Sequence, residues 1–266
     1  MEPAKKKFGQ NFITDKNLIK KIINILDQEP DHLIIEIGPG RGALTLELCN
    51  RFKKVVAIEI DSDMEMILKS NIPNNNLDLI INDVLKINFE NLIKDKYNRI
   101  SIISNTPYYI TSEIIFKTLK ISQKINKAVF MVQKEVAERI CAKANEKNYN
   151  NLSVACQFYS NLKYEFTVKK NLFTPIPKVD SAIISMSFIQ DNIGKVNDDI
   201  KFVSFVRKLF NNKRKTILNN LTNITNNKQK SLKVLDEIKI DSNKRPENIS
   251  LNEFINLFNE VQNEKN

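Results

Sequence analysis

Short apolar runs alternate with amphipathic segments along the chain as far as Gln190. Glycine, proline, asparagine or charged residues bound most of these runs, which predicts short, largely buried β-strands. Strands that are regularly separated by helices form βαβ units, so the pattern predicts an α/β fold with a mostly parallel sheet. The predicted strands are residues 33–37, 55–60, 77–81, 100–104, 128–132, 164–169 and 182–188.

The amphipathic segments predict the helices that cover this sheet. In the first of them, Leu18, Ile22 and Leu26 recur at helical spacing. Ser62 and Glu65 have the spacing of a capping box, so we expect them to begin the helix after the second strand. The predicted helices cover residues 15–27, 44–52, a segment after residue 62, and residues 112–121, 135–147 and 151–160.

The pattern changes after Lys195. From about residue 198 onward apolar residues such as Phe202, Phe205 and Leu209 recur at helical spacing, and no segment alternates like a strand. We therefore expect two domains. Residues 1–192 would contain the sheet, and residues 193–266 would form a small all-helical domain.

The composition indicates what kind of partner the protein binds. The 266 residues are 42% hydrophobic and 27% charged, as in an ordinary globular protein, but the formal net charge is +10. Such an excess of positive charge favours a polyanionic partner, most simply a nucleic acid. Lysine, asparagine and isoleucine are frequent throughout the chain, so the charge is suggestive rather than decisive.

Cysteine and histidine usage excludes several kinds of chemistry. Cys49, Cys141 and Cys156 are widely spaced and form no Cys-x-x-Cys pair, so neither a disulfide nor a zinc site is expected. His32 is the single histidine and is interpreted as structural, so no metal is expected. The N-terminus lacks a signal peptide and no run is long enough to span a membrane. We expect a soluble cytoplasmic protein.

A glycine-rich loop directly follows the first predicted strand. Gly38, Gly40 and Gly42 alternate with other residues there, and glycines allow the backbone to approach a ligand and to turn tightly into a helix. Glu59 ends the second strand, where a carboxylate can accept hydrogen bonds from ribose hydroxyls. Together these residues predict a site for a nucleotide-containing cofactor.

Two cofactor classes fit the glycine loop. Residues 38–43 also match the looser Gly-x-Gly-x-x-Ala pattern of NAD enzymes. Against NAD, Glu36 places a negative charge where a pyrophosphate would lie, and that charge suits the cationic amine and sulfonium of S-adenosylmethionine better. Asp83, after the third strand, is placed to accept from an adenine amino group, although a helix N-cap is an equally good interpretation.

The segment Asn105-Thr106-Pro107-Tyr108 follows the fourth predicted strand. The carboxyl end of a strand is where open α/β sheets place their ligands. An amide oxygen and a backbone carbonyl can accept the two N–H groups of a flipped-out base, proline restricts the turn, and the aromatic ring can stack on the base. From this segment alone, a simple strand-to-helix turn with half-buried tyrosines would be favoured.

Seven segments of the chain have the sequences of family motifs: residues 6–15, the glycine loop, and residues 105–110, 133–139, 173–181, 213–220 and 245–250. Together they resemble the KsgA-type ribosomal RNA small-subunit adenine dimethyltransferases across essentially the whole chain. The last two segments, in the helical part, separate this group from the related methyltransferases that confer macrolide resistance.

The resemblance implies a Rossmann-like methyltransferase domain with seven strands, the last of them antiparallel, and a helical C-terminal domain that binds RNA and docks on the ribosome. It implies S-adenosyl-L-methionine as the methyl donor, which leaves as S-adenosyl-L-homocysteine. The cofactor contacts implied at matching positions are Asn11, the backbone of Ile13, Gly38 at the methionine end, Glu59 at the ribose, Asp83 at the adenine, and Asn105 beside the methyl group.

The resemblance also implies a way to activate the target base. The Asn105 side chain and the Thr106 carbonyl would accept both hydrogens of the adenine amino group, and Tyr108 and Phe173 would sandwich the base. The family usually has leucine where this chain has Thr106. The contact is made by the backbone, so we expect the change to be tolerated.

The implied function is the dimethylation of two adjacent adenines near the 3′ end of small-subunit ribosomal RNA, with the immature small subunit as substrate and a monomeric enzyme. The basic segments 5–7 and 213–215 are the expected contacts to the RNA backbone. Two alternatives are an adenine methyltransferase of the large subunit and a non-catalytic factor in ribosome assembly.

Overall fold

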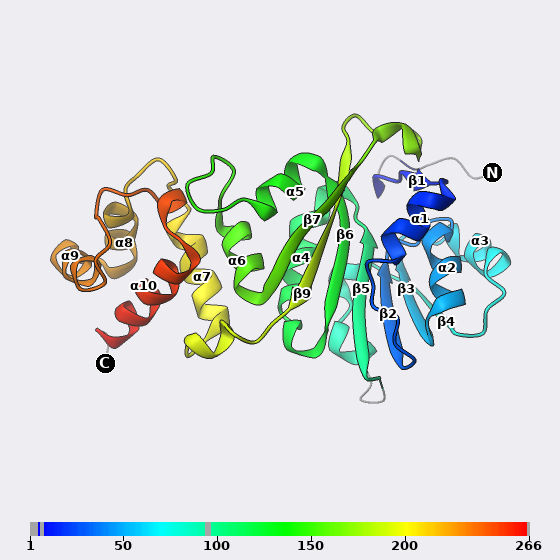
Figure 1. Cartoon of the computed structure of the whole chain (residues 1–266), viewed down its shortest axis with the longest axis horizontal. Coiled ribbons are helices and arrows are strands. Elements are labelled where there is room, and N and C mark those ends of the chain that lie inside the picture. Colours follow the sequence, from blue (N-terminus) through cyan, green and yellow to red (C-terminus); the bar gives the residue numbers. More distant parts are fainter. Residues whose placement is uncertain (1–4, 6–7, 94–96, 265–266) are drawn as a thin grey trace. The chain divides into compact units, whose positions relative to one another are not determined.

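The computed structural model describes residues 5, 8–93 and 97–264 (Figure 1). They form two compact units, one of residues 1–137 and 162–188 and the other of residues 138–161 and 189–266. We expected the division between residues 192 and 193. The chain leaves the first unit after Phe188, and residues 138–161 belong to the second unit as well.

The first unit is built around a seven-stranded sheet with the order β4-β3-β2-β5-β6-β9-β7. The neighbours from β4 to β6 pair in parallel, whereas β9 is antiparallel to β6. This arrangement confirms the predicted Rossmann-like sheet. The strands are β2 (His32–Ile37), β3 (Lys54–Glu59), β4 (Leu77–Ile81), β5 (Arg99–Asn105), β6 (Lys127–Gln133), β7 (Ser160–Val168) and β9 (Ser181–Phe188).

Central strands of the sheet are buried along nearly their whole length, as their continuous apolar runs predict. One core joins Ile34, Ile103 and Val129 of the sheet to Leu48 and Ile22 of the covering helices. Burial on both faces of a parallel sheet is what selects this α/β arrangement. The helices along this part of the chain are α1 (Lys16–Ile23), α2 (Ala43–Arg51), α3 (Met64–Asn71), α4 (Thr111–Leu119) and α5 (Lys134–Cys141).

A short second sheet joins the N-terminal segment to a distant part of the chain. Strand β1 (Phe12–Ile13) pairs antiparallel with β8 (Phe173–Thr174), with Ile13 opposite Phe173. We call residues 8–13 the N-terminal arm. The basic segment expected to contact RNA begins just before it, but of residues 5–7 only Lys5 belongs to the described residues.

Two helix predictions were wrong in detail. Helix α3 begins at Met64, and Ser62 does not cap it, because the Asp61 carboxylate accepts the Asp63 N–H and sets a different turn there. Helix α5 ends at Cys141, short of the predicted residue 147. The chain turns instead through Asn145, whose φ of +74° is incompatible with a right-handed helix.

The second unit consists of helices around an aromatic core. The rings of Phe158 and Phe202 lie with centroids 4.5 Å apart, and Phe258 packs edge-on against Phe202. The described residues from 189 to 264 contain no strand, as predicted. The helices are α6 (Asn151–Tyr159), α7 (Asp199–Leu209), α8 (Ile217–Thr225), α9 (Lys228–Glu237) and α10 (Leu251–Asn263).

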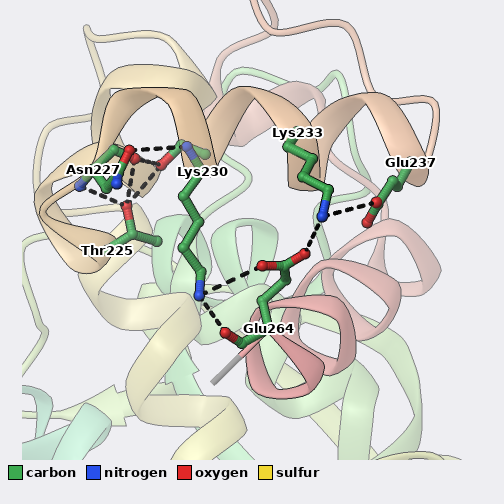
Figure 2. Close-up of polar contacts among 7 residues, drawn as sticks. Thr225, Asn227, Lys230, Lys233, Glu237 and Glu264 are labelled. Atoms are coloured by element: carbon green, nitrogen blue, oxygen red, sulfur yellow. Dashed lines mark hydrogen bonds and ion pairs between the residues drawn. The ribbon is translucent and has the colours of Figure 1, made fainter. Parts of the chain in front are cut away.

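Ion pairs fasten the end of α10 to α9 (Figure 2). Lys233 Nζ lies 2.8 Å from the Glu264 carboxylate, and Lys230 donates to the Glu264 backbone carbonyl. Asn227 caps α9 by accepting the Lys230 N–H at 3.0 Å. The end of the described chain is therefore held against its own unit. Across the described residues, no helix has both the length and the apolarity needed to traverse a bilayer.

Candidate active site

A cavity of about 810 Å³ lies at the carboxyl edge of the parallel strands. The N-terminal arm, the glycine loop after β2 and the ends of β3 and β5 line it. This is the edge where open α/β sheets bind ligands. The cavity brings together these sequence-predicted residues: Asn11, Ile13, Gly38, Glu59, Asp83, Asn105 and Tyr108.

The glycine loop has the backbone that its sequence predicts. Gly38 has a φ of +73° and donates its N–H to the Ile58 carbonyl at 2.9 Å. Gly40 has a φ of +56°, and a Cβ atom placed on it would lie 2.9 Å from Cε1 of Phe12. The glycine at position 40 thus allows the arm to pack directly on the loop.

Glu59 ties the end of β3 to the glycine loop. One carboxylate oxygen accepts the Gly40 N–H at 3.0 Å, and the other accepts the Asp61 N–H at 2.9 Å. The residue is 5% exposed, and burial raises the pKa of its carboxyl despite these two hydrogen bonds. Carboxylate oxygens accept more than one hydrogen bond each, so the fixed carboxylate retains acceptor capacity for ribose hydroxyls.

Asp83 has the N-cap role that was considered for it. Its Oδ1 accepts the Leu85 N–H at 2.9 Å and caps the 3₁₀ turn η2 (Val84–Lys86). The N-cap interpretation is therefore confirmed. The cap uses one of the two carboxylate oxygens, and Asp83 also lines the cavity, so a cofactor contact remains compatible with it.

The Asn105 side chain has a defined orientation. Its Nδ2 donates to the Asn11 carbonyl at 2.9 Å. A carbonyl can only accept, so the amide nitrogen must face the arm and Oδ1 is left as an acceptor. The arm therefore orients the amide so that its Oδ1 could accept a hydrogen bond from an amino group.

Tyrosines 108 and 109 occupy the 3₁₀ turn η4 (Tyr108–Ile110) directly after this amide. Tyr108 is half-buried, and its hydroxyl lies 2.8 Å from Oγ of Ser181. Tyr109 also lines the cavity and is 54% exposed. Tyr109 was not predicted as a site residue, since nothing in the Tyr-Tyr pair indicates that both rings reach the cavity.

Phe173 is not among the residues that line the cavity. Its side chain is 2% exposed and belongs to the hydrophobic core under the β1–β8 pair. A ring so buried cannot stack on a base without leaving its packing. The sandwich predicted for Tyr108 and Phe173 is therefore not formed in this arrangement.

The role predicted for the charge of Glu36 was wrong. Glu36 is 1% exposed and does not line the cavity. Burial raises the pKa of its carboxyl to about 8, so the group is largely uncharged at neutral pH. The geometry of Glu36 thus gives no reason to prefer a sulfonium cofactor over a dinucleotide.

His32 has the structural role that was expected. Its Nδ1 lies 2.9 Å from the Asp27 carbonyl and its Nε2 lies 2.9 Å from Oγ of Ser101. Burial lowers the pKa of the imidazole. The histidine lies at the start of β2, at the edge of the sheet opposite to the cavity, and takes no part in the site.

The cavity residue Gln10 and its partner Asp61, which does not line the cavity, were not predicted from the sequence. Gln10 and Asp61 hydrogen-bond to each other at 2.8 Å, although 51 positions separate them in the sequence. No periodicity or spacing indicates a contact between an arm and a loop so far apart. The one weak signal is the location of Asp61 just after a strand, because turns often contain aspartate.

The cavity fits an adenosine-containing cofactor. Glu59 and Asp83 supply acceptors at the ends of neighbouring strands, where ribose hydroxyls and an adenine amino group can donate. Gly38 leaves space in front of the Asn105 carbonyl, because a Cβ there would lie 3.5 Å from that oxygen. Asn105 adds an amide acceptor at the same edge, because its Oδ1 is not used in the hydrogen bond to Asn11.

The seven-stranded sheet with β9 antiparallel to β6 is that of the Rossmann-like methyltransferase class, and the cavity is compatible with it. The family model for ribosomal RNA adenine dimethylase matches residues 1–263. The chain is 63% identical over 257 residues to a protein of Mycoplasma capricolum named ribosomal RNA small subunit methyltransferase A, with 96% of this chain and 97% of that protein covered. A Mesoplasma florum protein of the same name is 58% identical over 263 residues, covering 97% and 98%.

Solved structures agree with this result. A dimethyladenosine transferase from Plasmodium falciparum superposes with a TM-score of 0.80 at 27% identity, covering 96% of this chain and 98% of that chain. The 23S rRNA methyltransferase ErmE has the same fold, with a TM-score of 0.73 at 23% identity and coverage of 95% and 100%. The chain belongs to the ribosomal RNA adenine dimethylase family. Its cofactor is S-adenosyl-L-methionine.

Proposed function

We propose that this enzyme transfers methyl groups from S-adenosyl-L-methionine to the amino groups of two adjacent adenines near the 3′ end of small-subunit ribosomal RNA, two to each. Family membership supports the reaction, and the names of the relatives support the small subunit as its target. The observation that carries the chemistry is the Asn105 amide, which the Asn11 carbonyl holds with Oδ1 free as an acceptor.

The target group needs activation because the lone pair of an adenine amino nitrogen is delocalised into the ring. Asn105 Oδ1 and the Thr106 carbonyl accept its two N–H bonds and favour a pyramidal nitrogen whose lone pair faces the methyl donor. The bound cofactor supplies an electrophilic methyl group on its sulfonium. The chain lowers the barrier by holding the amino group in position and by stabilising the charge that develops on it.

The proposed binding roles are those that the resemblance to the family implies, and the location of these residues around one cavity supports them. The arm at Asn11 and Ile13 encloses the cofactor, Gly38 lies at its methionine end, Glu59 accepts from the ribose and Asp83 from the adenine. Tyr108 stacks on the flipped base, and such stacking contributes roughly 1–3 kcal/mol. Phe173 is proposed as the second stacking ring, a role that requires its packing to loosen when the base enters.

The second unit supplies contacts to the RNA backbone. Lys213, Arg214 and Lys215 lie in a loop that Asn220 braces, because its buried Nδ2 donates to the carbonyls of Asn212 and Lys215 and to that of Thr216. Arg214 and Lys215 are exposed. A braced loop with exposed cations suits phosphate contacts. We propose that this monomeric enzyme acts on immature small subunits in the cytoplasm, where those subunits are assembled.

A methylation assay tests the proposal. Purified protein is incubated with labelled S-adenosylmethionine and unmethylated small subunits, and the RNA is digested and examined for dimethyladenosine. We expect dimethyladenosine at two adjacent positions, and none with Asn105→Ala, which should still bind cofactor. No transfer to small subunits under conditions where a related enzyme is active would contradict the proposal, as would label only in large subunits that are incubated in parallel.

A further inference from the structure

The N-terminal arm contacts several loops around the cavity mouth. Phe12 packs on Gly40, with the Arg41 guanidinium 4.3 Å above its ring. Gly9 lies against the ring of Tyr109, since a Cβ on Gly9 would be 3.6 Å from that ring. The arm therefore crosses the opening from the glycine loop to the turn after β5, and its position determines how the cavity is enclosed.

The arm is fastened to the loop after β3 by Asp61, which is 2% exposed. Gln10 Nε2 donates to Asp61 Oδ2 at 2.8 Å, and Lys5 Nζ donates to Asp61 Oδ1 at 2.6 Å. Gln10 Oε1 accepts the Lys5 N–H at 2.8 Å. Without Gln10 and Lys5, a nearly buried carboxylate would lose both of these side-chain partners, and such a loss is strongly unfavourable.

Gln10 lies one residue before Asn11, and Asp61 lies two residues after Glu59, so the fastening is close to both sides of the proposed reaction site. On the loop side, the Asp61 N–H donates to Oε1 of Glu59, and Oε2 of the same carboxylate accepts the Gly40 N–H. On the arm side, Gln10 is followed by Asn11, whose carbonyl orients the Asn105 amide. A single pair of side chains therefore connects the predicted ribose contact with the predicted amino-group contact.

We propose that Gln10 and Asp61 form a clasp that positions the arm, so that cofactor enclosure and the orientation of Asn105 are set together. The clasp rests on the proposed methyl transfer. Gln10 and Asp61 are positioning residues that act through Asn11 and Glu59. Lys5 adds charge to the clasp, and its Nζ also pairs with Asp63.

The polarity of the Gln10–Asp61 bond allows a specific test. In Gln10→Glu a carboxylate would face the Asp61 carboxylate, and in Asp61→Asn an amide N–H₂ would face the Gln10 N–H₂. The double variant restores one N–H···O bond with donor and acceptor exchanged and keeps the net charge of the pair. It also keeps the acceptor for the Lys5 N–H.

Calorimetric Kd values for S-adenosyl-L-homocysteine and kcat at saturating cofactor are the two readouts. Because a hydrogen bond to a charged group is at stake, we expect each single variant to raise Kd about tenfold and to lower kcat about tenfold. The double variant should return both values to within about threefold of the wild type. Rescue by exchange of polarity is not expected from a merely structural effect on folding.

Asp27→Asn is the matched control. Asp27 also pairs with two cations, Lys127 at 2.9 Å and Arg99 at 2.5 Å, but it does not line the cavity. It should lower Tm while leaving Kd and kcat near the wild-type values. If the clasp variants lower Tm in the same way without changing Kd or kcat, or if the double variant is not rescued, the clasp is overturned.

The two proposals fail in different ways. Wild-type protein that binds S-adenosyl-L-homocysteine but forms no dimethyladenosine would overturn the methyl transfer, while a tenfold change in Kd in the single variants would still support the clasp. Wild-type protein that binds no cofactor would overturn both. Normal transfer with unchanged Kd in Gln10→Glu would overturn the clasp alone.

Discussion

The Nδ2 of Asn105 donates to the backbone carbonyl of Asn11, 94 positions earlier in the chain. This contact makes the N-terminal arm part of the candidate active site, because it decides which atom of the Asn105 amide faces Asn11. Replacing the Asn105 side chain removes its hydrogen-bond acceptor, whereas displacing the N-terminal arm keeps the Asn105 amide but lets it rotate. The two kinds of change are therefore distinguishable in their effect on cofactor affinity.

Gly40→Ala should weaken both the fold and the cofactor site. The added Cβ would lie 2.9 Å from the Phe12 ring, at a φ of +56° that favours glycine. We expect a loss of about 1–3 kcal/mol in unfolding free energy and a raised Kd for S-adenosyl-L-homocysteine. Phe12→Leu in the same chain should recover part of the affinity. Full affinity in Gly40→Ala alone would show that the arm does not depend on this contact.

Glu36→Gln should stabilise the protein in a pH-dependent way. The Glu36 carboxyl keeps its proton to about pH 8 in the folded protein but loses it above about pH 4.5 when unfolded. The contribution of Glu36 to the free energy of unfolding is therefore fully present below about pH 4.5 and is lost as the pH rises to about 8. Each pKa unit corresponds to about 1.4 kcal/mol. The difference in unfolding free energy between Glu36→Gln and wild type should therefore be larger at pH 8 than at pH 4.5, by at most several kcal/mol.

The measurement for Glu36 is the difference in Tm between Glu36→Gln and wild type across this pH range. Comparing the two proteins at each pH cancels the contributions of other titrating groups. A difference that is constant with pH would contradict the neutral state assigned to this carboxyl.

Phe173 can be tested as a core residue and as a stacking ring separately. Phe173→Ala should lower the unfolding free energy by about 3–5 kcal/mol, because it leaves a cavity in the core. Phe173→Leu keeps most of the packing but has no aromatic face. If the ring also stacks on the base, Phe173→Leu should lower kcat/KM about tenfold with unchanged cofactor affinity. Unchanged kcat/KM would leave Phe173 with the core role alone.

Thr106→Val should be stabilising and active. The Thr106 side chain is buried, and its hydroxyl has no hydrogen-bond partner among the described residues. Replacing an unsatisfied buried hydroxyl by a methyl group of similar shape should add about 1 kcal/mol to the unfolding free energy. Transfer should persist because the expected contact is the backbone carbonyl. A large loss of kcat would instead assign the hydroxyl a role in the reaction.

The succession of strands and helices along the sheet-forming part of the chain and several cavity residues were predictable from the sequence. Buried parallel strands are continuous apolar runs, and glycines or acidic residues that follow them must lie at one edge of the sheet. Gly38, Glu59 and Asp83 follow this rule, and the amide of Asn105 lies at the end of its strand in the same way. The motifs identified the family because they extend over the whole chain.

Only the tertiary structure decided what depends on contacts between distant segments. The Gln10–Asp61 bond, the burial of Phe173 and the uncharged state of Glu36 follow from neighbours that no local pattern specifies. Helix α5 also ended earlier than its amphipathic pattern predicts. Local periodicity determines which face of an element is apolar, whereas hydrogen-bond partners and desolvation are properties of the folded chain.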